Sequence, residues 1–347
     1  MAAQTLGSSI GSMNATVSRT RHVVVVGTGG TIASRFDPVL GRTMASQGIE
    51  AIIGAAEKPR DLPRLTFENF STIAGFNMTL AFAEGLLERL REFVARDDVD
   101  GVVVTQGTDT MEETSFLADL LIDTAKPLIF TGAQLAHDHP QSDGPRNVID
   151  AIRAAAAETT GGLGATVCFN GQLHAAREVT KVHTSAIDTF QSYQYGALGI
   201  VDGERVIVYR RPQLRLHLRP ERLDGRVEIL KAALGSNGGM IEAARSAGVD
   251  GLIIEAFGRG NLSAEFGQAV ARACRAGLPV VVTSRCPVGR VEPIYGGGGG
   301  GGRDLEDAGA IFAGDLKGPK ARLLLIAALG DPAARGRIRE LFNLLGP

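Results

Sequence analysis

Along most of this chain, short uninterrupted aliphatic runs alternate with segments in which apolar residues recur every three or four positions. An uninterrupted β-branched run is typical of a strand buried on both faces, whereas the wider spacing indicates an amphipathic helix. The runs predict strands at 22–27, 101–105, 126–131, 164–169, 250–255 and 278–283. The wider spacing predicts helices at 80–96, 111–123, 146–158, 263–275, 317–329 and 333–345. This alternation predicts an α/β fold with a mostly parallel sheet and helices on both faces.

One polar segment, rich in arginine and proline, interrupts the alternation between Asp202 and Glu228. Strand and helix patterns resume directly after it, and a length of 347 residues also favours two domains over one. The predicted division is a disordered leader (1–20), a larger N-terminal domain (21–203), an extended linker (204–226) and a smaller C-terminal α/β domain (227–347). The leader lacks the apolar core of a secretory signal.

Composition excludes several classes of function. The formal net charge is -2 and both signs are interspersed, so neither a nucleic-acid-binding face nor a charged tail is indicated. The three cysteines have spacings that fit no zinc site or disulfide framework. No stretch reaches the roughly 20 apolar residues needed to span a bilayer, and a cytoplasmic location is the default expectation.

Two of the predicted strands stop abruptly at a Gly-Thr pair, within residues 23–34 and 102–113. Open α/β sheets place their ligands at the carboxyl ends of the strands. The two segments therefore bring the hydroxyl groups of Thr31 and Thr108 to the edge where chemistry is expected. This pairing suggests a threonine nucleophile.

Asp109 follows Thr108 just before a predicted helix. Thr110 and Glu113 have the spacing of a capping box, so the helix should begin at about Met111. The positive end of the helix dipole favours an ionised Asp109, and an anchored carboxylate here can hold a substrate ammonium group. The alternative is that Asp109 merely caps the helix.

A threonine nucleophile needs a base nearby, either a histidine or a lysine whose pKa is lowered by burial. His137 and His139 lie in a polar loop that is either solvated or a weak metal site, and no carboxylate is singled out for the other histidines. Lys181 is a lone lysine in a β-type stretch. On these residues alone it is as readily a solvated edge-strand lysine as a catalytic one.

Two glycine-rich segments invite other interpretations. Segment 27–30 lacks the third glycine of a dinucleotide fingerprint, because that position is Ile32, and the chain has no P-loop. These glycines instead allow the backbone to pass close to a substrate, with N–H groups facing developing negative charge. The run 296–302 is expected to be a flexible surface loop.

Together these motifs resemble the bacterial-type L-asparaginases, in the asparaginase/glutaminase family. The matching segments are 28–33 (Thr-Gly-Gly-Thr-Ile-Ala), 107–113 (Gly-Thr-Asp-Thr-Met-Glu-Glu), 131–133, 142–147, 179–181, 258–262 and 320–322. They occur in the family's order from about residue 22 to about residue 330. The resemblance implies a larger flavodoxin-like N-terminal domain, a smaller α/β domain and an amidohydrolase.

The resemblance also implies roles for individual residues. Thr31 would be the nucleophile, Lys181 and Thr108 a proton relay, and Asp109 the acceptor of the substrate α-amino group. Asn261 would enter the site of a neighbouring subunit in a homodimer or homotetramer. The implied substrate-binding positions are Gly30, Gly75, Phe76, Gly107, Asp109 and Asn261. No metal or organic cofactor is implied, and the partner is a small-molecule amide.

The chain departs from the family pattern at several positions. Gln106 replaces a histidine, Met44 falls near the place of a loop tyrosine, and Gly75 replaces a serine, while Phe76 makes the pocket more apolar. A glutamate found in some relatives would fall in the glycine run and is missing. The expected reaction is hydrolysis of asparagine to aspartate and ammonia, with loop 34–48 closing over the substrate.

Alternatives remain because of these departures. The same chemistry could act on glutamine, a D-amino acid amide or another small amide, since one methylene is discriminated by only about 1–3 kcal/mol. The chain could also be a degenerate member that binds a small ligand without turning it over. Transamidation on charged transfer RNA is disfavoured, because no added nucleic-acid-binding domain or basic face is visible.

Overall fold

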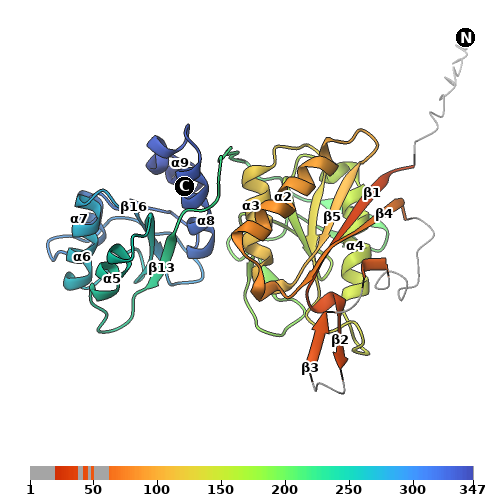
Figure 1. Cartoon of the computed structure of the whole chain (residues 1–347), viewed down its shortest axis with the longest axis horizontal. Helices are drawn as coiled ribbons and strands as arrows, with labels where there is room; N and C mark the ends of the chain where they lie inside the picture. Colours follow the sequence, from red (N-terminus) through yellow and green to blue (C-terminus); the bar gives the residue numbers. More distant parts are fainter. Residues whose placement is uncertain (1–19, 38–41, 46–47, 51–61, 347) are drawn as a thin grey trace, which may run out of the picture.

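The computed structural model describes residues 20–37, 42–45, 48–50 and 62–346, which form two lobes of unequal size (Figure 1). The larger lobe is built on an eight-stranded sheet of order β12-β11-β8-β7-β6-β5-β1-β4. Its strands are β1 (His22–Gly29), β4 (Arg64–Ile73), β5 (Gly101–Thr105), β6 (Leu128–Thr131), β7 (Ala165–Phe169), β8 (Gln172–Ala175), β11 (Gly199–Asp202) and β12 (Arg205–Val208). The five strands from β4 to β7 run parallel, and the remaining three continue the sheet antiparallel. The mostly parallel α/β sheet is thus confirmed.

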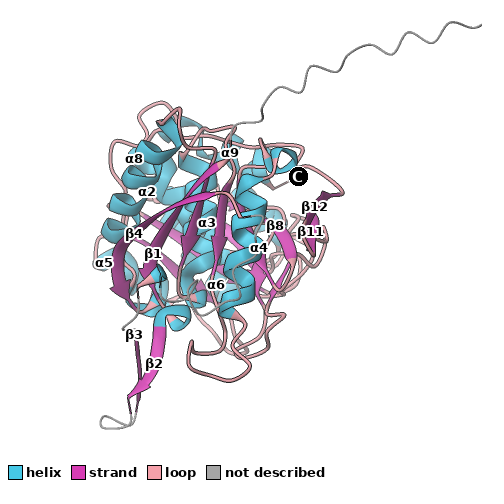
Figure 2. Cartoon of the chain, turned by 90° about the vertical axis from the view of Figure 1, so that its right-hand side faces the viewer, coloured by secondary structure: helices cyan, strands magenta, loops and turns pink. Residues whose placement is uncertain are grey.

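Helices cover both faces of this sheet, as Figure 2 shows. Alternate residues of β1 face opposite layers: Val24 and Val26 pack with α2 (Leu80–Ala95) and α3 (Met111–Leu121). Val23 and Val25 pack instead with α4 (Gly144–Ala156). Because both faces of the strand are buried, every position of the run is aliphatic.

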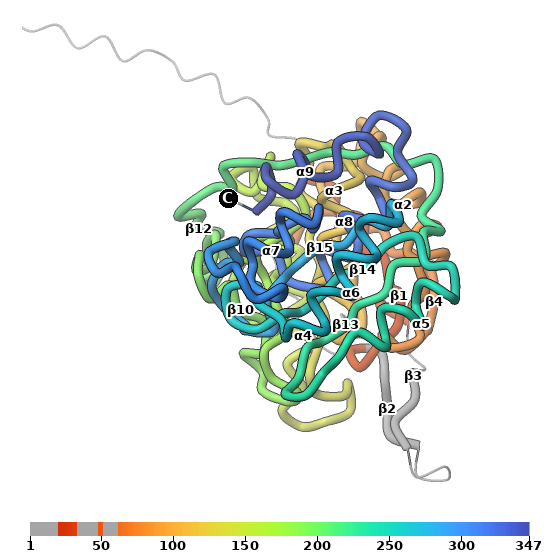
Figure 3. The backbone as a smooth tube through the Cα atoms, turned by 90° about the vertical axis from the view of Figure 1, so that its left-hand side faces the viewer, coloured from red at the N-terminus to blue at the C-terminus, as the bar shows by residue number. Residues whose placement is uncertain are grey.

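The smaller lobe has a four-stranded parallel sheet of order β13-β14-β15-β16. Its elements are β13 (Val227–Lys231), α5 (Gly239–Ser246), β14 (Gly251–Ala256), α6 (Ala264–Arg275), β15 (Val280–Ser284), α7 (Gly302–Asp307), β16 (Ile311–Phe312), α8 (Gly318–Gly330) and α9 (Ile338–Leu345). Figure 3, viewed from the side of this lobe, shows α5, α6 and α7 on its outer face. The smaller α/β domain is therefore also confirmed.

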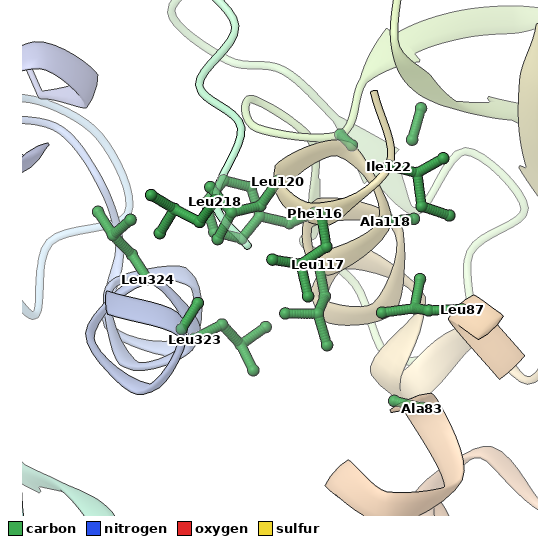
Figure 4. Close-up of a cluster of buried hydrophobic side chains, with 14 of the residues drawn as sticks. Ala83, Leu87, Phe116, Leu117, Ala118, Leu120, Ile122, Leu218, Leu323 and Leu324 are labelled. Carbon is green, nitrogen blue, oxygen red and sulfur yellow. The ribbon is translucent and has the colours of Figure 1, made fainter. Parts of the chain in front are cut away.

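The two lobes share one apolar core. Leu323 and Leu324 of α8 lie opposite Leu117 and Leu120 of α3, with Leu218 between the helices (Figure 4). All of these side chains are buried. Burial of this kind contributes about 25 cal/mol per Å² of apolar surface, so the contact fixes the orientation of α8 relative to the larger domain.

Part of the predicted linker belongs to the large sheet. Residues Arg205–Val208 form β12 and pair with β11, and the backbone N–H of Leu218 donates to the carbonyl of Leu120. The prediction of an extended linker over 204–226 is wrong at Arg205–Val208. β12 lies at the edge of the sheet and is only partly buried, so it lacks the long apolar run that marks a central strand. The same reason explains why β4, with alternating polar residues, was not predicted.

The glycine run 296–302 is also more ordered than expected. The N–H groups of Gly297, Gly298, Gly299 and Gly301 all donate to the carboxylate of Asp304. These backbone hydrogen bonds lower the pKa of Asp304. The backbone of the run therefore surrounds the Asp304 carboxylate. Glycine permits this close approach because it has no Cβ.

The predicted lid at 34–48 contains a β-hairpin of β2 (Ser34–Asp37) and β3 (Arg42–Ala45). Residues 38–41 and 46–47 of that lid lie outside the described residues, as do residues 1–19 of the predicted leader. Within the described ranges, no helix combines the length and apolar character needed to cross a membrane.

Candidate active site

Three neighbouring strands deliver three turns to one edge of the large sheet. β1 lies between β4 and β5, and all three run parallel, so their carboxyl ends meet at the same place. The turns that follow are Thr31–Ala33 after β1, Gly75–Asn77 after β4 and Thr108–Thr110 after β5. This edge therefore gathers the predicted positions of the larger domain except Lys181, which is on the short strand β9 (Thr180–Lys181).

Glycines allow the three turns to touch through their backbones. A Cβ built on Gly30 would lie 2.3 Å from the backbone nitrogen of Gly107, and one on Gly75 would lie 3.1 Å from the carbonyl carbon of Gly107. Gly30 also has a φ of +83°, a conformation that L side chains rarely adopt. Any side chain at Gly30 would push the first turn away from the third. Of the three glycines expected to bind substrate, Gly107 thus lies against both Gly30 and Gly75.

Thr108, Asp109 and Lys181 form one hydrogen-bonded group. The Lys181 ammonium donates to Thr108 Oγ1 at 2.8 Å and to Asp109 Oδ1 at 2.7 Å. Thr108 is 5% exposed, and the Lys181 side chain is 16% exposed, whereas that of Asp109 is 53% exposed. Lys181 is therefore not a solvated edge-strand lysine, and Asp109 does more than cap a helix, because its carboxylate pairs with the ammonium. Residues 72 or more positions apart meet here.

The Thr108 hydroxyl has a second partner that the sequence did not reveal. It donates to Gln134 Oε1 at 3.0 Å, and the Gln134 amide nitrogen in turn donates to the carbonyl of Ala186. The backbone N–H of Gln134 donates to the carboxylate of Asp143. Its place directly after the matching segment 131–133 was the available signal. The Thr108 hydroxyl is therefore fixed on both sides, accepting from Lys181 and donating to Gln134.

Gln106, at the position where the resemblance would place a histidine, connects the turns after β5 and β4 through Thr110. It is fully buried; its amide nitrogen donates to Thr110 Oγ1 at 3.2 Å, and its Oε1 accepts from Thr114 Oγ1 at 2.8 Å. Thr110 Oγ1 donates onward to the carbonyl of Gly75 at 3.0 Å. The predicted capping box is wrong, because the Thr110 side chain makes no capping hydrogen bond to the helix. Its hydroxyl is committed to the neighbouring turn instead.

The surroundings of Thr31, Phe76 and Asn261 differ from those of Thr108. Thr31 is half-buried, and its hydroxyl has no hydrogen-bond partner among the described residues. Phe76 is 73% exposed at the rim of the same edge. Asn261 lies in the smaller domain after β14, and its Oδ1 accepts from the N–H of Gly302. The chain brings Gly30, Gly75, Gly107, Thr108, Asp109 and Lys181 together, whereas the role of Asn261 in a neighbouring subunit stays a prediction.

Among the described residues, no histidine is hydrogen-bonded to Thr31 or to Thr108. The His139 ring accepts from the N–H of Gln141, and the His183 ring accepts from those of Ser185 and Ala186. Burial lowers the pKa of His174 to about 4, so that ring is neutral at pH 7. In the part of the chain that the structure describes, no three His, Cys, Asp or Glu groups gather as metal ligands would.

Comparison with known proteins identifies relatives along the whole folded region. The family profile "Asparaginase, N-terminal" matches residues 22–214, and "Glutaminase/Asparaginase C-terminal domain" matches residues 226–342. A probable L-asparaginase of Deinococcus radiodurans is 38% identical over 338 residues, covering 93% of this chain and 97% of the relative. A glutamyl-tRNA(Gln) amidotransferase subunit of Archaeoglobus fulgidus is 32% identical, and the match covers 89% of this chain and 75% of that protein.

A solved structure has the same fold. The crystal structure of a probable cytoplasmic L-asparaginase from Campylobacter jejuni superimposes with a TM-score of 0.83 at 28% sequence identity. The match covers 93% of this chain and 99% of that chain, so both domains correspond.

Proposed function

The chain belongs to the asparaginase/glutaminase family of amidohydrolases, and on that premise we propose that it hydrolyses the side-chain amide of L-asparagine through Thr31. The observation that carries the proposal is the fixed group of Thr108, Asp109 and Lys181, placed against the Thr31 turn by the backbone contact between Gly30 and Gly107. An alcohol next to an anchored ammonium and carboxylate is suited to acyl transfer. No metal is needed for this chemistry.

The proposed reaction has two steps. In the first, the Thr31 oxygen bonds to the carboxamide carbon, and the C–N bond breaks as the nitrogen takes a proton and leaves as ammonia. In the second, water adds to the Thr31 ester, aspartate is released, and the Thr31 oxygen regains a proton. Thr108 and Lys181 relay the protons, while backbone N–H groups of the glycine turns stabilise the oxyanion in each step.

Asp109 is the proposed anchor for the substrate ammonium group. One of its oxygens accepts from Lys181, and its side chain is about half exposed, so the carboxylate remains open to a ligand. The Gly75 turn is the proposed contact for the substrate carboxylate. It offers backbone groups and no hydroxyl, because a side chain there would meet the Gly107 backbone. Substrate orientation would therefore depend on backbone donors more than on side chains.

Gly75 and Phe76 also support the alternative proposal that the chain hydrolyses small amides other than L-asparagine. A pocket without the serine hydroxyl, and with an exposed phenylalanine at its rim, would discriminate less strictly among glutamine, D-asparagine and other small amides. A missing hydrogen-bond partner lowers discrimination more than a change in apolar volume does. A cytoplasmic location, and an oligomer with Asn261 of a second copy at the site, remain part of the proposal.

The test is ammonia release from L-asparagine, L-glutamine and D-asparagine by the wild type and by Thr31→Ala and Thr108→Ala. Each variant is expected to lose at least about a thousandfold in kcat/KM, because each removes a group that acts in the transition state. Thr124→Ala is the matched control. Thr124 accepts a hydrogen bond from the N–H of Lys126 at the opposite end of the sheet, so full activity is expected.

Two results would contradict the proposal. Full activity of Thr31→Ala or Thr108→Ala would remove that threonine from the chemistry. Tight binding of aspartate by calorimetry, without hydrolysis of any amide by the wild type, would indicate a binding protein that has lost turnover.

A further inference from the structure

A buried lysine of the smaller domain holds the turn between β8 and β9 that leads into Lys181. Lys320 lies in the first turn of α8 and is 3% exposed. Its ammonium donates to the carbonyl of Arg177 at 3.1 Å and to the carbonyl of Val179. Val179 is two residues before Lys181. A side chain of the smaller domain is thus bonded directly to the backbone that carries the site ammonium.

Other contacts also hold residues 177–179: the N–H groups of Glu178 and Val179 donate to the carbonyl of Ala175, and Arg177 pairs with Asp315. Next to Lys181 itself, however, the regular structure is short. β9 is only two residues long and pairs with the equally short β10 (Phe190–Gln191), with Lys181 opposite Phe190. A two-residue ladder is weak support for a side chain that must reach Thr108 within hydrogen-bond distance. Lys320 adds two charge-assisted hydrogen bonds from the opposite side, and these are stronger than neutral ones.

Burying an ammonium group costs free energy unless the group is paired, so the burial of Lys320 needs an explanation. Burial lowers the pKa of Lys320 to about 8. The charged groups around it are Glu112 and Glu113 of α3, together with Arg177 and Glu178 of the turn before β9. The glutamates favour its charge and Arg177 opposes it. Both bonds of the ammonium nevertheless go to the backbone carbonyls of Arg177 and Val179, not to these carboxylates.

We propose that Lys320 is a positioning residue, by which the smaller domain sets the placement of Lys181 against Thr108 and Asp109. The inference builds on the proposed function, because it assigns the smaller domain a part in the same reaction. Lys320 does not touch the substrate. It acts through the carbonyls of Arg177 and Val179, and its effect is on the rate of the chemical step.

The experiment compares the wild type with Lys320→Met, which keeps the length and apolar stem of the side chain but loses both hydrogen bonds. Because small misplacements of a reacting group are costly, kcat for asparagine is expected to fall about ten- to a hundredfold, with KM changed by less than about threefold. Amide hydrogen exchange in segment 179–191 should rise. Lys317→Met is the matched control, since Lys317 donates to the carbonyl of Gly289 inside the smaller domain and should leave both readouts unchanged.

A pH series adds a readout that a purely structural role would not move. Lys320 in the wild type loses its charge above about pH 8, so the ratio of wild-type to Lys320→Met kcat should narrow between about pH 7 and about pH 9. The folded pKa lies below the unfolded one, so this group does not destabilise the fold as pH rises. The ratio of the two kcat values should therefore narrow without a fall in the midpoint of unfolding.

The outcomes separate this inference from the proposed function. Should the wild type hydrolyse no amide, the proposed function fails, and hydrogen exchange in segment 179–191 still tests the positioning. Lys320→Met with wild-type kcat, unchanged exchange in that segment, or a kcat ratio constant across the pH range would overturn the inference. If Lys320→Met does not fold, Lys320→Gln replaces it, because glutamine can keep one hydrogen-bond donor. This variant is expected to show a smaller fall in kcat and a smaller rise in hydrogen exchange. A wild-type kcat in Lys320→Gln would overturn the inference.

Discussion

Thr31 and Thr108 are the same residue type at the same edge of one sheet, yet their surroundings are opposite. Thr108 is buried, accepts from Lys181 and donates to Gln134. Thr31 is half-buried, and its hydroxyl bonds to no other described residue. The difference fits the two roles proposed above. The Thr31 hydroxyl is free to pair with a base or with substrate when the substrate binds, whereas the Thr108 hydroxyl is already held in a fixed direction, as a proton relay requires.

The largest expected effect is on activity, and the free energy of unfolding then distinguishes the two hydroxyl groups. Thr31→Val and Thr108→Val should each lose about a thousandfold in activity, which is about 4 kcal/mol of transition-state stabilisation. Only Thr108→Val should also lower the free energy of unfolding, by about 1–3 kcal/mol, because the Lys181 ammonium and the Gln134 side-chain oxygen each lose one hydrogen-bond partner. Urea unfolding and ammonia release at one pH measure both quantities. Equal destabilisation by the two variants would show that the contrast is absent.

A smaller effect is expected from the acceptor of the Thr108 hydroxyl. Gln134→Met keeps the side-chain length but removes the oxygen, so the Thr108 hydroxyl is no longer directed and kcat should fall about tenfold. Gln134→Glu is the control, because it keeps an acceptor and loses only the donor to Ala186. Steady-state kinetics on both variants provide the measurement. If Gln134→Met keeps wild-type kcat, the orientation of Thr108 does not depend on Gln134.

The smallest effect is expected at the Gly75 turn, which follows β4. Gly75→Ser would bring a Cβ to 3.1 Å from the Gly107 backbone, so the Thr108 turn must shift by a few tenths of an ångström. We expect a loss of about 1 kcal/mol in the free energy of unfolding and a fall of about threefold in kcat. Thermal unfolding and kinetics measure these. A gain in affinity for asparagine with unchanged kcat would instead mean that the turn accommodates a serine freely.

Much of the fold was predictable, for a reason visible in particular strands. β1, β5, β6, β7, β14 and β15 are buried on both faces, and each shows the uninterrupted run that predicts such a strand. β4 and β12 were missed because each is an edge strand that is only partly buried, so neither has the long apolar run of a central strand. The capping box at Thr110 was wrong because a tertiary partner, the Gly75 carbonyl, took the hydroxyl.

The candidate site was predictable only in part. The strand ends and the following helix start located Thr31, Thr108 and Asp109, and the resemblance singled out Lys181. Gln134 and Lys320 received no role, because nothing in a local pattern shows that a hydroxyl 26 positions away, or a carbonyl 141 positions away, will be their partner. Lys320 was noticed only as part of a matching segment.

By itself the sequence determined that the turns after β1 and β5 lie at one edge of the sheet, because their aliphatic runs predict buried, parallel strands. The structure added the turn after β4. The tertiary structure decided which atoms meet there. Three sets of contacts join residues far apart in the chain: those of Gly30 and Gly75 with Gly107, that of Lys181 with Thr108, and those of Lys320 with the turn before Lys181. A hydrogen bond forms or fails over a few tenths of an ångström. Only the packing of both domains sets distances to that precision.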